Sequence, residues 1–235
     1  MQIKSLLTFI CLCLATGLHA QDKFSRKLLK DIEVFGGVGT TSYFGDIGGK
    51  DSKITKIQAI FDNLDIDLWQ VRCMATAGVR AIPFRNVAFS FQISPMLLSG
   101  NDLRSNYASR GYAFNTWLWE GCLEGEFYFA GRVTGAAPFG ILGVSGMLYA
   151  FKNNVSNTRS EWYAGNSLIF GLGTRLPSKT RYTHSLDASF HFTATDFLDG
   201  FKTGRNSNDI FFILSYKVNY QVYSSWYYDH KGLVR

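Results

Sequence analysis

The 235-residue sequence is poor in proline, cysteine and charge: it holds only 4 prolines and 4 cysteines, and 18% of its residues are charged. These counts exclude a collagen-like repeat, proline-rich disorder and a disulfide scaffold. Globular proteins typically carry about 25% charged residues. Aromatic residues, in contrast, reach 16%, and there are 23 glycines. We infer that something other than water covers much of the surface.

Residues 1–20 are interpreted as a secretory signal peptide. Lys4 supplies a positive charge, residues 6–14 form an apolar segment, and Ala20 precedes the expected cleavage site. Cleavage removes two of the four cysteines and one lysine, which leaves 23 basic against 18 acidic residues. No basic run is interleaved with aromatics, so nucleic acid is not an expected partner.

A membrane-spanning helix is excluded after the signal segment, because no apolar run of about 18 or more residues follows it. Contact with a membrane would therefore have to be made by strands. Residues 68–81 alternate between apolar and polar or small side chains, the period-two pattern of a strand. Four more segments repeat the pattern clearly, and three glycine-rich ones do so weakly. The eight expected strands are 32–43, 68–81, 87–97, 116–129, 138–151, 166–176, 185–194 and 210–221.

The spacing of these segments favours an all-β, eight-stranded antiparallel transmembrane barrel of the outer-membrane type. Each segment has an apolar row long enough to cross an apolar band about 25 Å tall. Links after the second, fourth and sixth strands are short and the others are long, as in outer-membrane barrels, whose short turns face the periplasm. We therefore expect a periplasmic segment at 21–31, the barrel at 32–223 and a periplasmic tail at 224–235, with both termini in the periplasm.

Aromatic side chains are expected to form two girdles at the membrane surfaces. The alternative is that they form the core of a soluble sandwich. One girdle would contain Trp69, Trp117 and Trp119, and the other Phe127, Phe129, Phe139 and Tyr220.

The inward rows of the expected barrel carry charged residues. Side chains normally fill the interior of an eight-stranded barrel, so we expect these charges to neutralise one another there. A catalytic or proton-handling cluster is the alternative, but Asp187 and His191 lie about 13 Å apart along one strand. The set is Arg72, Arg80, Glu120, Glu124, Glu126, Asp187, His191 and Lys217.

No enzyme or cofactor motif is present, since the sequence lacks a phosphate loop, Cys-x-x-Cys, His-Glu-x-x-His and Gly-x-Ser-x-Gly. We expect neither catalytic activity nor a cofactor. A lipid-modifying barrel enzyme stays open, with His184 and His191 as its candidate histidines. Cys73 is expected to face outward and Cys122 inward, which disfavours a disulfide between them.

The long loops carry further charges, which we expect to form ion pairs that close the outer mouth. A calcium site built from three carboxylates is the alternative. The residues concerned are Asp46, Arg104, Arg110, Asp196 and Asp199.

Three runs resemble the PorG family: residues 37–46 (GVGTTSYFGD), the stretch 104–120 with its YAFNT segment, and TDFLD at 195–199 followed by SND at 207–209. This family supplies an outer-membrane barrel to the type IX secretion system of Bacteroidetes. The resemblance covers essentially the whole mature chain and implies a non-enzymatic role, in which the barrel anchors or stabilises the periplasmic ring of PorK and PorN. Other small Bacteroidetes barrels share parts of these motifs, so a stand-alone adhesin, narrow channel or lipid-modifying enzyme is the alternative.

The tail offers a docking surface for such a ring, because exposed tryptophan and tyrosine are favoured anchors at interfaces. We expect Trp226, Tyr227 and Tyr228 to contact the ring together with the short turns. The alternative is that Trp226 and Tyr227 complete the inner aromatic girdle.

Overall fold

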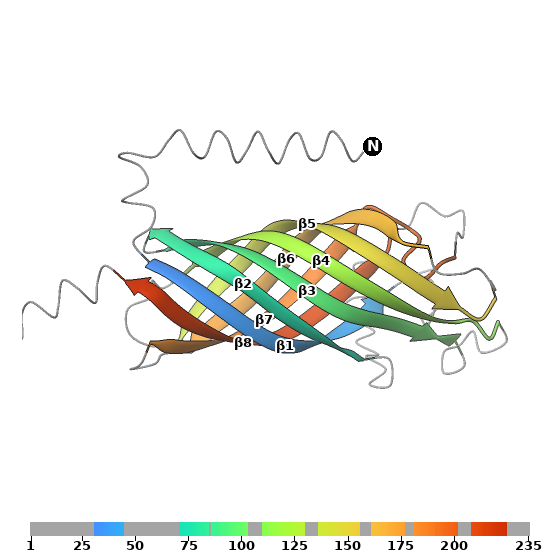
Figure 1. Cartoon of the computed structure of the whole chain (residues 1–235), viewed down its shortest axis with the longest axis horizontal. Coiled ribbons are helices and arrows are strands. Elements are labelled where there is room, and N and C mark those ends of the chain that lie inside the picture. The colour runs from blue at the N-terminus through green and yellow to red at the C-terminus, as the bar shows by residue number, and fades with distance from the viewer. Residues whose placement is uncertain are drawn as a thin grey trace, which may run out of the picture.

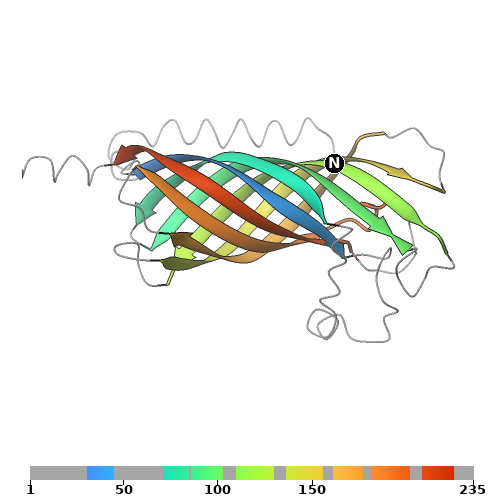
Figure 2. The same ribbon diagram turned by 90° about the horizontal axis from the view of Figure 1, so that it is seen from below.

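The chain forms a closed antiparallel barrel in which each strand pairs with the next and β8 pairs with β1 (Figures 1 and 2). The computed structural model describes residues 31–44, 71–84, 86–102, 110–129, 136–155, 161–176, 181–201 and 208–224. The strands are β1 (Asp31–Phe44), β2 (Arg72–Phe84), β3 (Val87–Asn101), β4 (Ala113–Tyr128), β5 (Ala137–Asn153), β6 (Tyr163–Leu176), β7 (Tyr182–Thr193) and β8 (Ile210–Ser224). The expected fold class is confirmed.

The two ends of the barrel differ in their connections. Residues 85–86, 129–136 and 177–181 link strands at what we call the short-turn end, where β1 starts and β8 finishes. Residues 45–71, 102–112, 154–162 and 194–209 link strands at the opposite, long-loop end. The alternation of short and long links expected from the sequence is therefore confirmed.

Period-two alternation sets which side chains face the lumen. On β4, Leu123 is 60% exposed on the outer surface whereas its neighbour Cys122 is fully buried. Cys73 is exposed on the outside of β2, so the two cysteines are free and lie on opposite faces of the wall, as expected. The three glycine-rich segments also form strands.

Closure of the barrel between β1 and β8 depends on two glycines. A Cβ atom at Gly37 would lie 2.5 Å from the Tyr216 carbonyl oxygen, and one at Gly39 would lie 2.5 Å from that of Leu214. Both positions face the lumen, where the strand curves tightly against β8. The glycines that blur the sequence pattern of β1 are thus the residues that allow the seam to close.

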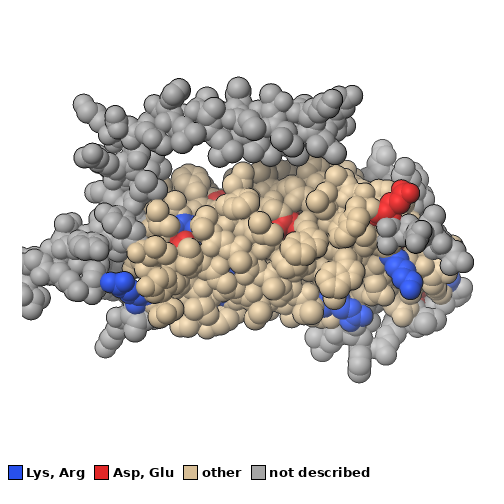
Figure 3. Space-filling view, in the orientation of Figure 1, with Lys and Arg blue, Asp and Glu red and all other residues tan. Residues whose placement is uncertain are grey.

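The outer surface is a wide apolar belt, and charged side chains are mostly found toward its two ends (Figure 3). Trp117, Trp119, Phe127 and Phe129 are all exposed, as the girdle hypothesis requires. Phe139 contradicts it: this ring is 1% exposed and lies in the lumen against Tyr128. Trp69 lies outside the described residues. No helix in the described part of the chain is long and apolar enough to cross a membrane.

Candidate functional site

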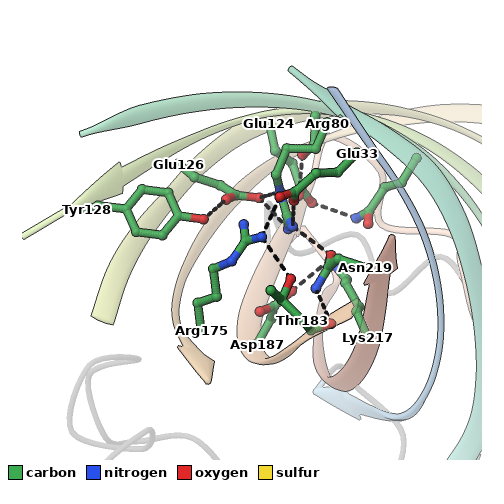
Figure 4. A network of polar contacts seen from close by, with 12 residues as sticks. Glu33, Arg80, Glu124, Glu126, Tyr128, Arg175, Thr183, Asp187, Lys217 and Asn219 are labelled. Atoms are coloured by element: carbon green, nitrogen blue, oxygen red, sulfur yellow. Dashed lines mark hydrogen bonds and ion pairs between the residues drawn. The ribbon is translucent and has the colours of Figure 1, made fainter. Parts of the chain in front are cut away.

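A network of buried charges occupies the lumen toward the short-turn end (Figure 4). Its centre is Arg80, which projects inward from β2 and is 1% exposed. Arg80 Nε donates to Glu126 Oε1 at 2.8 Å, and its Nη1 donates to Asn219 Oδ1 at 2.6 Å. The same Nη1 lies 3.4 Å from Glu33 Oε2. One guanidinium therefore ties β1, β2, β4 and β8 together across the interior.

Two further ion pairs complete the network. Arg175 on β6 donates to Glu33, so Glu33 bridges two guanidinium groups. Lys217 Nζ lies 2.7 Å from Asp187 Oδ2. The expectation of mutual neutralisation inside a filled lumen is confirmed for these groups, because each buried charge has an opposite charge in contact.

The aromatic ring of Phe35 is part of the same network. The Arg80 guanidinium carbon lies 5.1 Å from the ring centroid and Lys217 Nζ lies 5.2 Å from it. Two cations thus lie close to one aromatic ring in the low-dielectric interior, where such contacts are strongest.

Sequence reasoning did not identify every member of this network. Glu33, Arg175 and Asn219 were not singled out, and all three are buried. The pattern was weakly marked in β1 and β6, which hides the inward positions of Glu33 and Arg175, whereas Asn219 lies in the polar row of the clearly patterned β8. Arg72, the first residue of β2, is only half-buried at the long-loop end.

The lumen holds more acid than base among the described residues. Glu124 takes part in no close ion pair with a described base. It accepts hydrogen bonds from Gln92 Nε2 at 2.7 Å and from Ser90 Oγ at 3.3 Å. Neutral donors therefore satisfy this carboxyl group, which explains the polar inward row of β3.

Glu120, His191 and Ser189 form a second polar cluster. His191 Nδ1 lies 2.8 Å from Glu120 Oε1, and its Nε2 lies 3.0 Å from Ser189 Oγ. The expectation that Asp187 and His191 do not pair holds, since Asp187 pairs with Lys217. Glu120 reaches His191 from β4 across the barrel, a contact that spacing along one strand could not indicate.

The order acid, imidazole, hydroxyl is that of a nucleophilic triad, in which the acid orients the histidine and the histidine activates the serine. Here, however, Glu120 Oε1 is shared with other hydroxyls. Ser145 Oγ donates to it at 2.5 Å, and Ser167 Oγ lies 3.3 Å away. A cavity of about 350 Å³ borders Ser145 and Ser167, but neither Ser189 nor His191 is among its lining residues.

Residues 194–201 of the β7–β8 link, which we call the plug, pack into the long-loop end of the barrel. Leu198 is completely buried, and its carbonyl accepts a hydrogen bond from Thr116 Oγ1 at 2.6 Å. Phe197 and Phe201 pack beside it. The buried apolar cluster beneath this plug contains Tyr43, Met74, Met96, Leu98, Phe114, Leu118, Met147, Tyr149, Phe151, Phe211 and Ile213.

Charged groups at this mouth follow the sequence expectation in part. Arg110 Nε lies 3.0 Å from Asp102 Oδ2, an ion pair between the ends of the β3–β4 link. Asp196 is half-buried in the plug and Asp199 is buried there. Asp46 and Arg104 lie outside the described residues. No group of three or more His, Cys, Asp or Glu side chains able to hold a metal occurs in the described ranges.

Two carboxyl groups contact the Tyr43 phenol where the end of β1 meets the plug. Tyr43 Oη lies 2.5 Å from Asp209 Oδ1 and 3.1 Å from Asp199 Oδ2. A phenol has only one proton to donate, so both contacts are hydrogen bonds only if one carboxyl group is protonated. The pKa of Asp209 is raised from 3.8 to about 7, mainly because the group is buried and also because the Asp199 charge is near, and its hydrogen bonds only partly offset this rise.

This raised pKa predicts that the plug weakens as pH increases. The folded plug favours protonated Asp209, so its stability declines from about pH 3.8 to about pH 7 and is constant above that range. We expect amide exchange at Leu198, corrected for its intrinsic pH dependence, to accelerate over this interval. Asp209→Asn should abolish the acceleration, and Asp199→Asn should move it to lower pH. An unchanged profile in Asp209→Asn would exclude this residue as the titrating group.

Comparison with known proteins supports the fold and gives no closer assignment. No protein-family model matches the chain, and no curated protein matches it. Among solved structures, Neisserial surface protein A is similar with a TM-score of 0.51 and 8% identity, over 81% of this chain and 96% of that one. The OprG outer-membrane protein of Pseudomonas aeruginosa gives 0.49 and 9%, over 84% and 98%. The N-terminal barrel of OprF from the same organism gives 0.46 and 9%, over 82% and 99%.

The fold thus defines the class: the chain is a small eight-stranded barrel of the outer-membrane type. At these identities the likeness concerns the fold alone.

Proposed function

We propose that this chain is a non-enzymatic barrel of the outer membrane that serves the type IX protein secretion machinery by anchoring or stabilising the periplasmic ring of PorK and PorN. The observation that carries the structural part of this proposal is the filled lumen. Arg80 and its acids occupy one part of it, and the Leu198 plug closes the long-loop end. A barrel with this interior offers its outer wall and its two ends for function, which suits an anchor better than a conduit.

The link to secretion comes from the sequence motifs, and the structure supplies a context for one of them. The TDFLD run at 195–199 contains the centre of the plug, Leu198, and its last residue contacts Tyr43 from the 37–46 run. Two of the segments that carry the family resemblance are therefore far apart in the sequence but in contact in the fold. The signal peptide, the outer-membrane location and the periplasmic orientation of the short-turn end belong to the same proposal.

The ring would be met at the short-turn end, where β8 finishes at Ser224. Trp226, Tyr227 and Tyr228 follow directly in the sequence and lie outside the described residues. They are the proposed anchors, together with the short turns. Their aromatic rings would supply the buried contact area that dominates interface energies.

Removal of residues 225–235 tests this contact. We expect the truncated barrel to fold and insert but to lose co-purification with PorK and PorN after crosslinking in intact cells. The replacement of Trp226, Tyr227 and Tyr228 by alanine should give the same loss, whereas Val155→Ala at the long-loop end should not. Full co-purification of the truncated barrel would remove the tail from the interface, and absence of both ring proteins from wild-type crosslinks would refute the secretion role.

The alternative is a stand-alone barrel, and the Glu120–His191–Ser189 arrangement specifically favours a lipid-modifying enzyme. A fluorophosphonate probe, which reacts covalently with activated serines, separates the two functions. The enzyme reading requires labelling that Ser189→Ala abolishes and Ser185→Ala leaves intact. Ser185 is a matched control, since it faces inward on the same strand and its Oγ has no hydrogen-bond partner among the described residues. The anchoring proposal expects no labelling of either form.

A further inference from the structure

A notch in the barrel wall lies where β7 ends and the plug begins. It is a partly open hollow of about 350 Å³, a volume at the lower end of the range for ligand sites. Strands β5, β6 and β7 supply most of its walls, and the link between β7 and β8 supplies Ala194 and Asn208. The lining consists of Val144, Ser145, Asn166, Ser167, Leu168, Phe192, Thr193, Ala194 and Asn208.

The apolar wall of the notch is continuous with the outer belt of the barrel. Val144 is 51% exposed, Leu168 53% and Phe192 37%, and all three project outward. On either side the same face continues into exposed Leu142 and Phe170. A cavity bordered by this surface opens toward whatever surrounds the barrel, which in a membrane is the acyl-chain region of lipid.

The polar part of the notch contains two amide side chains in an otherwise apolar setting. Asn166 and Asn208 are exposed, and neither side chain makes a hydrogen bond with any described residue. The Asn166 backbone carbonyl already accepts from Ala194 N at 2.9 Å, which fixes the edge of β6 against the end of β7. In a bilayer, an exposed amide that lacked a hydrogen-bond partner would be unfavourable, so these two groups would need a polar partner from outside the chain.

The other polar side chains of the notch already form hydrogen bonds within the protein. Ser145 and Ser167 bond to one another at 2.6 Å and both contact Glu120. Thr193 Oγ1 donates to the carbonyl oxygens of Thr195 and Asp209, each at 2.8 Å. The groups left for recognition are therefore neutral amides. Binding through them would depend on hydrogen bonds and apolar contact, with little effect of ionic strength.

We propose that the notch binds one acyl chain of a membrane lipid, and that a hydroxyl, ester or amide group near the head of that lipid bonds to Asn166 and Asn208. The chain lies against Val144, Leu168 and Phe192. The site goes beyond the secretion role and requires only that the barrel stand in a bilayer. It also places a bound lipid beside Thr193, the residue from which the plug departs.

Photo-crosslinking tests this site in the full-length protein. The probe is a phosphatidylcholine with a diazirine in its acyl chain, diluted into dioleoylphosphatidylcholine vesicles that contain the folded barrel. We expect peptides carrying Leu168 and Phe192 to be labelled in preference to the rest of the apolar belt. Leu168→Trp fills the notch and should reduce this labelling about tenfold, whereas Leu172→Trp on the same face of β6 should leave it unchanged. Labelling should be the same at low and high salt.

Two further outcomes decide the proposal. Asn166→Leu keeps a side chain of similar shape but removes one amide, so it should reduce labelling at the notch severalfold. The folded variant should keep the wild-type heat-modified mobility in gel electrophoresis. Uniform labelling around the whole belt would identify ordinary surrounding lipid and overturn the proposal. Equal losses in Leu168→Trp and Leu172→Trp would overturn it as well, because a general effect on the wall would then replace a specific site.

Discussion

Arg80→Met is expected to lower the free energy of unfolding by about 3–5 kcal/mol, the cost of breaking a buried ion pair by removing one partner. Glu126 and Asn219 would each lose a donor, at 2.8 and 2.6 Å respectively in the native lumen. Methionine is an unbranched side chain that occupies much of the space of Arg80 but has no charge and no donor, so the lost stability comes mainly from the missing ion pair and hydrogen bonds. Urea unfolding of the barrel in lipid vesicles, followed by tryptophan fluorescence, measures it.

The double variant Arg80→Met with Glu126→Gln provides the matched control. Removing the stranded acid should restore part of the lost stability, because the two residues act as one unit. Glu126→Gln alone should also be destabilising, since Arg80 would then depend on Glu33. Strictly additive losses in the double variant would contradict the network as described.

Ala77→Arg is expected to cost about 2–4 kcal/mol, the penalty for an arginine on the lipid face near the middle of a membrane. Ala77 projects outward from the centre of β2, between the inward Thr76 and Gly78. Ala77→Leu should be neutral because it adds apolar surface toward lipid. Unfolding in vesicles of defined thickness gives both values.

The neighbouring position gives the opposite expectation. Thr76 is 4% exposed, receives a hydrogen bond from Ser94 Oγ at 2.9 Å and faces a filled lumen. Thr76→Leu should therefore destabilise through lost hydrogen bonds, and Thr76→Arg through lack of space and excess charge. Equal tolerance of arginine at positions 76 and 77 would contradict the register of β2.

The sequence was informative about the wall of the barrel because period two depends only on neighbouring residues. The apolar Val79 and the charged Arg80 indicate opposite faces of β2, and in the structure Val79 lies on the outer surface and Arg80 in the lumen. Aromatic type was a poorer guide. Phe139 was assigned to a girdle because its strand contains Gly140, Gly143 and Gly146, which conceal the alternation. A phenylalanine suits both lipid and a filled lumen, so only the register could decide its side.

Contacts across the lumen could not be predicted from the sequence. Glu120 and His191 were both expected to face inward, but their approach to 2.8 Å depends on the curvature and register of the closed sheet. The plug was missed for a related reason. Leu198 lies in a long link, where burial has no periodic signature, and only the closed mouth shows what it fills.

Oxygen accessibility along β4 tests the central claim that the apolar rows face lipid and the polar rows fill the lumen. Single cysteines at positions 115–127, in a background with Cys73 and Cys122 replaced, would carry a spin label in vesicles. Collisions with oxygen should alternate with period two, high at Trp117, Trp119, Leu123 and Phe127 and low at Leu118, Glu120, Glu124 and Glu126. A flat profile, or high accessibility to a water-soluble relaxation agent at the apolar positions, would show that this face does not contact lipid.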